Sequence, residues 1–270
     1  MLDLKHVSKT FNPGTVNEKV ALKGIDLHLE EGDFATIVGS NGAGKSTLFN
    51  AIAGEFIADT GTITLAGQDI TMMPDYRRSK VIGRMFQDPL KGTAPHMTIE
   101  ENLALAFLRA SGNTSPFSRI SRADRALFAE RLAALGLGLE DRMKQPVGLL
   151  SGGQRQALTL LMATLVTPKL LLLDEHTAAL DPATADKVLE LTKKIVAEHR
   201  ITCLMITHNM HDALALGNRT LMMDGGRIVL DIAGPERSGL TVSSLLTRFA
   251  KQAGHDLADD RVLLSGTEQP

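Results

Sequence analysis

A glycine-rich segment between a strand pattern and a helix pattern constrains the fold of this 270-residue chain more than any other feature. Residues 34–38 are rich in β-branched side chains and predict a strand, and residues 48–53 have the pattern of a helix that ends at Gly54. Between them, residues 39–46 fit the spacing G-x-x-x-x-G-K-[ST]. Glycines let backbone N–H groups curve around phosphate oxygens, and the helix N-terminus adds partial positive charge. The segment therefore predicts a site for a di- or triphosphate.

Each residue of this phosphate loop has an expected part in binding. Lys45 would reach the β- and γ-phosphates, Ser46 would hold Mg²⁺, and Thr47 would support a phosphate oxygen. The backbone of the preceding residues would surround the phosphates. The predicted nucleotide-binding residues of the loop are Gly39, Ser40, Asn41, Gly42, Ala43, Gly44, Lys45, Ser46 and Thr47.

Two carboxylates follow a second apolar run and complete the expected chemistry. Residues 170–173 are four leucines, which predict a buried strand of a parallel sheet, and Asp174 and Glu175 come directly after it. We expect Asp174 to act on Mg²⁺ and Glu175 to polarise a water molecule aimed at the γ-phosphate. Without the phosphate loop, such a pair would more often be a helix cap or a solvated pair.

Further strands and helices alternate along the chain. Residues 201–206 and 220–223 predict two more buried strands, and residues 182–199 predict a helix. This alternation is typical of an α/β fold with a parallel sheet. The middle of the chain is mostly helical by pattern, and residues 242–252 form a helix candidate near the C-terminus.

Composition excludes several other classes of protein. The chain has 29 Lys and Arg against 31 Asp and Glu, so it lacks the basic excess of a nucleic-acid-binding protein. Its one cysteine, Cys203, rules out an intrachain disulfide and a cysteine-based zinc site. The longest apolar stretch, residues 157–166, is shorter than the roughly 20 residues that a membrane span needs. We expect no signal peptide, no membrane span and no nucleic-acid partner.

Five further motifs make the chain resemble the ATP-binding cassette (ABC) ATPases. Residues 150–156, LSGGQRQ, resemble the signature motif of that family. Gln87 resembles its Q-loop glutamine, residues 179–181 resemble its D-loop, and His208 resembles its switch histidine. Phe11 lies where the family has an aromatic residue that stacks on adenine. The motifs occur in the family's order and cover residues from about 5 to 230.

The resemblance implies a site shared between two copies of the chain. In the family the signature helix faces the ATP of a second subunit, so a head-to-tail dimer with two ATP molecules is expected. Glu175, His208 and Gln87 are the expected catalytic residues, and Ser46, Gln87 and Asp174 the expected Mg²⁺ residues. The residues expected to contact the nucleotide outside the phosphate loop are Phe11, Ser151, Gly152, Gly153, Gln154 and Asp181.

The resemblance also implies a P-loop NTPase fold of the RecA-like type, with a parallel sheet, an antiparallel β part at the N-terminus and an inserted helical subdomain. The expected core comprises residues 1–88 and 154–236. Residues 89–153 form the expected helical signature subdomain, and residues 237–270 a C-terminal helical extension.

The expected function is that of the ATPase subunit of a bacterial importer. Such a subunit lies on the cytoplasmic face of the membrane, binds separate permease subunits and works indirectly with an extracytoplasmic substrate-binding protein. In the family a permease helix docks on the segment after the Q-loop, here residues 87–102, in which Leu90, Met97 and Ile99 are apolar. The alternatives are a soluble ABC ATPase of the iron–sulfur assembly type, the ATPase of an exporter, or a cassette that binds ATP only as a structural clamp.

One segment departs from the family pattern. The usual residues after the catalytic glutamate are Pro-Thr-Ser-Gly-Leu-Asp, whereas residues 176–181 are His-Thr-Ala-Ala-Leu-Asp. This D-loop, together with residues 11–18, resembles a bacterial group of tryptophan/tyrosine uptake systems with permeases like those for branched-chain amino acids. The basic run at residues 77–80 predicts a solvated helix face.

Overall fold

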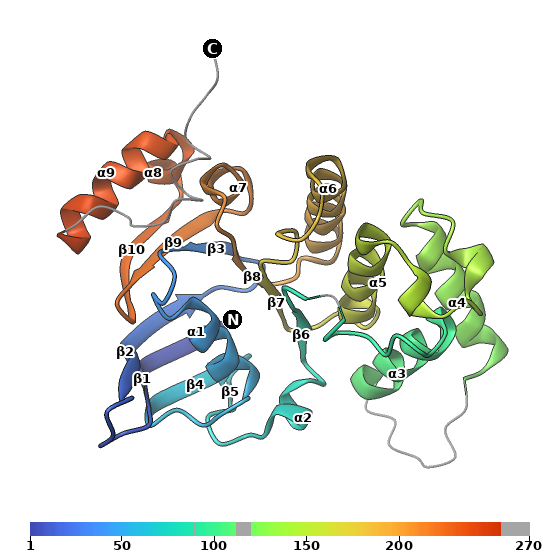
Figure 1. Cartoon of the computed structure of the whole chain (residues 1–270), viewed down its shortest axis with the longest axis horizontal. Helices are drawn as coiled ribbons and strands as arrows, with labels where there is room; N and C mark the ends of the chain where they lie inside the picture. Colours follow the sequence, from blue (N-terminus) through green and yellow to red (C-terminus); the bar gives the residue numbers. More distant parts are fainter. Residues whose placement is uncertain (89, 112–119, 255–270) are drawn as a thin grey trace. The chain divides into compact units, whose positions relative to one another are not determined.

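The computed structural model describes residues 1–88, 90–111 and 120–254 (Figure 1). The chain divides into two compact units: unit 1 combines Met1–Arg78 with Arg200–Pro270, and unit 2 comprises Ser79–His199. Both contain strands and helices, and the antiparallel and parallel pairings confirm the predicted mixed α/β class. The domain boundaries expected from the sequence stay a prediction.

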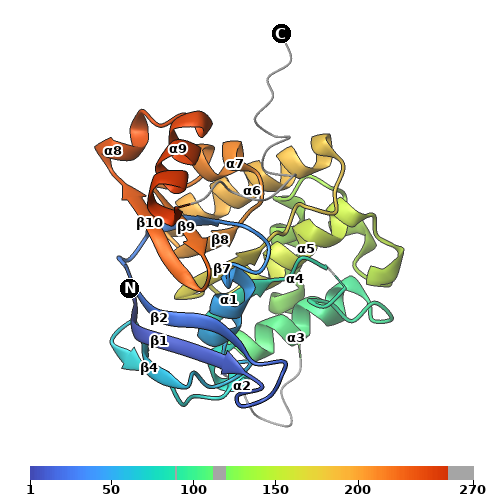
Figure 2. The same ribbon diagram turned by 60° about the vertical axis from the view of Figure 1, so that its left-hand side comes forward.

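An antiparallel sheet forms the N-terminal part of unit 1. Its order is β2-β1-β4-β5, and both views show β1 between β2 and β4 (Figures 1 and 2). In the register Leu2↔Leu29 and Leu4↔Leu27, apolar side chains from β1 and β2 are buried opposite each other. The strands are β1 (Leu2–Phe11), β2 (Lys19–Leu29), β4 (Thr60–Leu65) and β5 (Gln68–Asp69).

Parallel strands form the second part of unit 1. β3 (Phe34–Val38) pairs in parallel with β8 (Cys203–Ile206) and with β9 (Arg219–Asp224), and β9 pairs antiparallel with β10 (Arg227–Ala233). All five residues of β3 are buried, because a parallel strand in the interior is covered on both faces.

The C-terminal helices of unit 1 pack onto the helix that follows β8. Leu245 and Phe249 are fully buried in one apolar cluster with Met210 and Ala213. Arg237 donates hydrogen bonds to the carbonyl oxygens of Ala213, Leu214 and Leu216, at 3.0, 2.9 and 2.5 Å, and so satisfies the C-terminal carbonyls of that helix. The helices of unit 1 are α1 (Lys45–Ala53), α2 (Asp75–Arg78), α7 (Met210–Ala215), α8 (Pro235–Ser238) and α9 (Val242–Ala253).

Unit 2 joins a pair of parallel strands to a helical core. β6 (Ile82–Met85) and β7 (Leu170–Asp174) are parallel, with Met85 opposite Leu173. Ile99, Phe128 and Leu158 are buried in the apolar cluster between the helices. The helices are α3 (Ile99–Ser111), α4 (Arg122–Ala133), α5 (Gly152–Thr164) and α6 (Pro182–His199), with 3₁₀ turns at Glu140–Arg142 and Val147–Leu149. No helix among the described residues is long and apolar enough to cross a membrane.

The prediction that the basic run at residues 77–80 is solvated is wrong at Arg78, which is buried, whereas Arg77 and Lys80 are exposed. Only 1% of Arg78 is exposed, and its guanidinium donates to the carbonyl oxygens of Ala51 and Ile52 at 2.8 and 2.9 Å. It also donates to the carbonyl oxygens of Met73 and Thr71, at 2.7 and 2.9 Å. Arg78 thus satisfies carbonyls at the C-terminal end of α1, the helix that begins at the phosphate loop.

We expect Arg78→Met to lower the free energy of unfolding by about 3 kcal/mol. The change leaves four carbonyl oxygens without a charged donor, and each such loss in a buried site costs about 1–3 kcal/mol before the structure relaxes. Urea unfolding of the purified chain measures the effect. Arg77→Met is the matched control, because Arg77 is exposed, and it should change stability by less than about 0.5 kcal/mol. Equal losses in the two variants would contradict the assignment.

Candidate functional site

The phosphate loop leaves the end of β3 with a backbone that only glycine accommodates at its first position. Gly39 has φ 151°, and a Cβ added to it would lie 2.1 Å from the carbonyl oxygen of Met223 in β9. At Gly44, where φ is 102°, an added Cβ would lie 2.6 Å from the carbonyl oxygen of Ala21. Since these distances are far shorter than a carbon–oxygen contact, both positions exclude any side chain. The backbone of the loop thus passes close to β2 and β9 at these two glycines.

Lys45 and the first turn of α1 concentrate positive charge at this loop. Lys45 is 5% exposed, and its Nζ donates to the carbonyl oxygens of Gly39 and Ser40 at 2.6 and 3.1 Å. The N-cap of α1 is Gly44, and no side chain among the described residues caps this helix. By contrast, α4, α5 and α9 each begin with a capping box. An ammonium group beside amides that no side chain caps is suited to phosphate oxygens.

His208 is placed at the same edge of the parallel strands as the phosphate loop. Ile37 of β3 lies opposite Ile206 of β8, and the backbone N–H of Thr207 donates to the carbonyl oxygen of Ile37 at 3.1 Å. Because the two strands are parallel, Gly39 and His208 leave that edge at the same level, two residues beyond the paired isoleucines. Asn209 then caps α7 by accepting hydrogen bonds from the backbone of His211 and Asp212.

Phe11 ends β1 and packs against an aromatic residue that the sequence analysis missed. Its ring meets that of Phe56 edge-on, with centroids 5.3 Å apart and an interplanar angle of 85°. The Lys9 ammonium lies 5.8 Å from the centroid of Phe11 and 5.3 Å from that of Phe56, and it pairs with Asp59 at 2.7 Å. Phe11 therefore belongs to a small aromatic cluster, of which it is a half-buried member.

In unit 2, the two parallel strands bring Glu175 and Gln87 to one edge. Met85 lies opposite Leu173, so Gln87 and Glu175 each follow two residues later at the same level. Glu175 has φ 46°, a left-handed conformation that costs a residue with a side chain roughly 1–2 kcal/mol. Such strain persists only where the surroundings impose it, and it is common at functional sites. The structure therefore gives Glu175 a strained backbone and a half-buried side chain.

The signature residues form the N-terminus of α5. Ser151 is the N-cap: its Oγ accepts from the backbone of Gln154 at 3.3 Å, and the Gln154 side chain accepts from the backbone of Ser151 at 3.2 Å. A Cβ added to Gly153 would lie 2.2 Å from Cγ2 of Thr184 at the start of α6. A side chain at Gly153 would displace the Thr184 methyl group, so the glycine lets α5 and α6 pack closely here, a contact that the sequence analysis missed.

The D-loop aspartate begins the next helix. Asp181 Oδ1 accepts from the backbone N–H of Thr184 at 3.0 Å. Hydrogen bonds from Thr184 lower the pKa of the Asp181 carboxyl, so the carboxylate is charged at neutral pH. Capping a helix is an ordinary structural role for an aspartate. The Asp181 residue is also exposed.

His176 departs from the family pattern and is buried in unit 2. It is 1% exposed, and burial lowers its pKa to about 4, so its ring is neutral at pH 7. Its carbonyl oxygen accepts a hydrogen bond from Gln156 Nε2 at 2.6 Å, and its Nε2 lies 3.3 Å from Oγ1 of Thr192. No local sequence pattern indicates these partners, because they come from two different helices.

Asn102 is a second residue that sequence reasoning missed. It is 1% exposed in α3, and its Oδ1 accepts from the backbone of Ala94 at 2.8 Å. Its Nδ2 donates to the carbonyl oxygens of Ala94 and Thr98, at 3.1 and 2.9 Å. The loop that follows Gln87 is therefore fixed to α3 by one buried amide. Pro89, which falls within the expected docking segment 87–102, lies outside the described residues.

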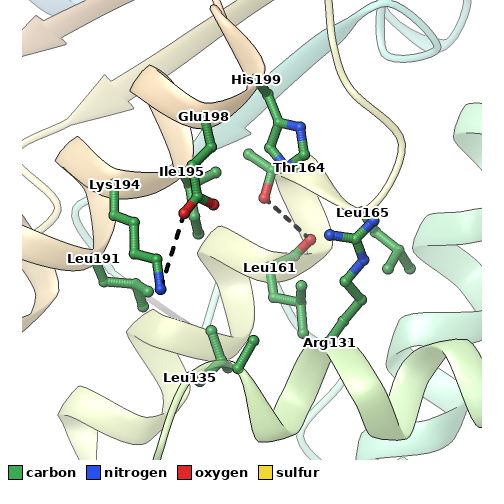
Figure 3. A pocket seen from close by; sticks show the side chains of 11 residues that line it. Arg131, Leu135, Leu161, Thr164, Leu165, Leu191, Lys194, Ile195, Glu198 and His199 are labelled. Carbon is green, nitrogen blue, oxygen red and sulfur yellow. Dashed lines mark hydrogen bonds and ion pairs between the residues drawn. The ribbon is translucent and has the colours of Figure 1, made fainter.

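A pocket lies between α4, α5 and α6, and none of the predicted site residues lines it (Figure 3). Leu135, Leu161 and Ile195 line it, while Lys194 pairs with Glu198 at 3.9 Å beside it. Its volume of about 60 Å³ is too small for a nucleotide. We do not assign the nucleotide site to this pocket.

The match to a family profile decides the identity of the chain. The ABC transporter profile matches residues 22–178, which is more than half of the sequence. The chain belongs to the ABC transporter family. The Tyrosine transport ATP-binding protein of Clostridioides difficile is 43% identical over 249 residues, which cover 92% of this chain and 98% of that protein. The Methionine import ATP-binding protein MetN 2 of Enterococcus faecalis is 38% identical over 232 residues, which cover 85% of this chain and 64% of that protein.

Solved ABC cassettes have the same fold. The chain resembles the dimeric post-hydrolysis state of the ATP-binding cassette MJ0796 bound to ADP and Pi, with a TM-score of 0.74 and 28% identity, covering 86% of this chain and 98% of that one. It also resembles the ADP conformation of MJ1267, an ATP-binding cassette of an ABC transporter, with a TM-score of 0.72 and 27% identity, covering 88% and 92%. The resemblance expected from the sequence motifs is confirmed, and this ABC protein is an ATPase.

We expect Gly39→Ala to destabilise this ABC ATPase more than Gly42→Ala. Both glycines have positive φ, but only at Gly39 would the new methyl group strike backbone, whereas nothing lies within 4 Å of a Cβ at Gly42. Forcing a methyl group into packed structure costs about 1–3 kcal/mol, which is the expected difference in the free energy of unfolding. Urea unfolding without nucleotide measures it. Equal losses would show that the contact with Met223 does not constrain the loop.

Proposed function

We propose that this chain is the ATP-binding and ATP-hydrolysing subunit of a bacterial ABC importer for a small solute, with amino acids as the first substrate class to test. The observation that carries the proposal is the strained Glu175 at the end of β7, level with Gln87 across a parallel strand pair. Relatives named for tyrosine transport and methionine import support the uptake of amino acids.

The phosphate loop binds the triphosphate in this proposal. Lys45 turns its ammonium from the loop carbonyls toward the β- and γ-phosphates, and the amides at the start of α1 donate to phosphate oxygens. Phe11 stacks on the adenine, and Phe56 packs edge-on against the Phe11 ring. Ser40, Asn41, Gly42, Ala43 and Thr47 complete the nucleotide contacts of the loop.

Glu175 is the proposed general base. A carboxylate at the end of a buried strand can accept a proton from the attacking water, and Gln87, at the same level on the next strand, orients that water. His208, which leaves the strand edge beside the phosphate loop, contacts the γ-phosphate and reports its presence. These residues position the reactants, because phosphoryl transfer to water depends mainly on positioning and charge.

The residues proposed for Mg²⁺ offer the ligands that this ion prefers. Ser46 presents an exposed hydroxyl in the first turn of α1, and Asp174 presents a half-buried carboxylate at the end of β7. Hydroxyl, carboxylate and the amide oxygen of Gln87 are all hard oxygen donors, so the donor set fits Mg²⁺. When bound, Mg²⁺ neutralises negative charge on the phosphate oxygens.

The working assembly in this proposal is a head-to-tail dimer bound to permease subunits at the cytoplasmic face of the membrane. Dimeric cassettes among the solved neighbours support the dimer. Ser151, Gly152, Gly153 and Gln154 of one copy contact the ATP of the other, and Asp181 lies at the contact between copies. An extracytoplasmic binding protein delivers the solute to the permease.

The segment after Gln87 is the proposed docking surface for the permease. Leu90 is 44% exposed, and Met97, seven residues later in the sequence, is half-buried. Asn102 fixes this loop to α3, so a helix laid on it meets a surface of defined shape. Gln87 lies at the start of the same segment, which connects docking with the attacking water.

We expect Glu175→Gln to keep ATP binding but slow hydrolysis by about 10²–10⁴-fold, the range typical for losing a positioned general base. Phosphate release and nucleotide titration of the purified chain measure the two effects, and size-exclusion chromatography with ATP should show more dimer. Glu190→Gln is the matched control, because Glu190 is an exposed carboxylate on α6 that pairs with Lys193. Near-normal turnover of Glu175→Gln would place the base elsewhere.

We expect the double change Leu90→Asp with Met97→Asp to lower co-purification with the permease by at least about tenfold. Buried charge on a docking surface costs more than the roughly 1.4 kcal/mol that a tenfold loss of affinity requires. Hydrolysis by the isolated subunit should survive. Val16→Asp serves as control, because Val16 is fully exposed and lies outside the segment. Normal assembly and transport by the double variant would assign docking to another surface.

A further inference from the structure

Three side chains in unit 2 form what we call the His176 cluster: Gln156 of α5, His176 after β7, and Thr192 of α6. All three are buried, at 1%, 1% and 0% exposed. Gln156 Nε2 donates to the carbonyl oxygen of His176 at 2.6 Å, and the His176 ring meets the Thr192 hydroxyl at 3.3 Å. The cluster thus joins two helices to the residue that directly follows Glu175.

The number of available protons decides which group donates and which accepts in the contact between His176 and Thr192. The Thr192 hydroxyl has one proton, and it donates to the carbonyl oxygen of Val188 at 2.8 Å. Its oxygen therefore accepts from Nε2–H of His176. The neutral His176 ring therefore carries its proton on Nε2, and its side chain is held in one orientation. A proline at this position, as in the usual family pattern, could not donate this hydrogen bond.

The orientation of the Gln156 amide also follows from which of its atoms can donate a hydrogen bond. Its Nε2 must face the His176 carbonyl oxygen, because an amide oxygen there would repel it. Its Oε1 is left buried without a hydrogen-bond partner within residues 1–88, 90–111 and 120–254. A buried acceptor without a donor is unfavourable, so an apolar side chain would suit this position better if packing were its only role. The hydrogen bond from Gln156 Nε2 to the His176 carbonyl oxygen offsets the cost of burying Oε1.

The backbone that the cluster holds is the strained turn at Glu175. Glu175 has φ 46°, and its carbonyl oxygen accepts from the backbone of Ala178 at 3.0 Å. The next carbonyl is held by Gln156, and the next side chain is buried against α6. A left-handed residue keeps its conformation only where such neighbours impose it.

We propose that the His176 cluster fixes the position of Glu175 and couples it to α5, the helix that Ser151 caps. The histidine that stands at residue 176 in place of the family's proline then serves to position Glu175. Gln156 lies on the same helix as the signature residues, and Gly153 packs against Thr184 in the same region. A displacement of the N-terminus of α5 is therefore transmitted to the carboxylate through one hydrogen bond. The proposal rests on the proposed role of Glu175 as the base.

The first test replaces Gln156 with methionine, which keeps the length of the side chain and removes the donor. We expect kcat for ATP hydrolysis to fall by about 10- to 100-fold while KM changes by less than about twofold, because a misplaced base slows the chemical step without weakening binding. Phosphate release by the full chain with ATP and Mg²⁺ measures both constants. A purely structural role would instead lower the urea midpoint and leave kcat of the folded fraction unchanged, which would overturn the proposal.

A conservative pair of variants keeps the test independent of any folding defect in Gln156→Met. Thr192→Ser retains the accepting hydroxyl and should keep kcat within about twofold, whereas Thr192→Val removes it and should lower kcat. Thr164→Val is the matched control, since its buried hydroxyl also donates to a carbonyl of its own helix, at 2.8 Å, but lies outside the cluster. Equal kcat values for Thr192→Ser and Thr192→Val would contradict the proposal.

A double-mutant cycle separates failure of this inference from failure of the proposed function. In single-turnover measurements, adding Gln156→Met to Glu175→Gln should slow the residual reaction by less than about twofold, because the group that the cluster positions is already gone. The same fold loss in both backgrounds would show that the cluster acts independently of Glu175 and would overturn the inference. Normal turnover of Glu175→Gln alone would instead overturn the proposed base.

Discussion

Parallel strand pairing is the interaction on which the candidate site depends. Because parallel strands run in the same direction, their carboxyl ends meet at one edge, and residues at equal distances beyond a matched pair leave the sheet at one level. In unit 1 this brings Gly39 and His208 together, through Ile37 and Ile206. In unit 2 it does the same for Gln87 and Glu175, through Met85 and Leu173. Short loops then need only small adjustments to place the side chains.

Much of the fold could be predicted from the sequence, and most of the candidate residues were proposed from it, because the signals are local. The strand at Phe34–Val38 and the helix at Pro182–His199 agree with the expected ranges, since continuous apolar runs and helical periodicity depend on neighbouring residues. The phosphate loop and the signature segment are equally local, as contiguous motifs with fixed spacing. One helix start was predicted too late: α1 begins at Lys45, within the loop motif, and not at residue 48.

Of the residues that sequence reasoning missed, Arg78 and Gln156 act through partners distant in the chain, and Asn102 acts through carbonyl oxygens four to eight residues before it. Arg78 lies in a basic run that looks solvated, yet its acceptors at Ala51 and Ile52 are 26 residues or more away. Asn102 and Gln156 are single amides in helices, and their partners are loop carbonyls. No periodicity or spacing marks such residues, because burial and hydrogen bonding are properties of the folded chain. A buried polar side chain becomes informative only when its partners are known.

The unprotected start of α1 has a consequence for the stability of the whole protein. Since Gly44 provides no side-chain cap, a bound phosphate would itself complete the first turn of the helix. A ligand that binds only the folded chain stabilises it in proportion to the logarithm of its concentration, by about 2.7 kcal/mol at 100 times its Kd. The nucleotide would then stabilise the folded chain as well as serve as the substrate of the enzyme. The thermal resistance of the chain would thus rise with the concentration of free nucleotide.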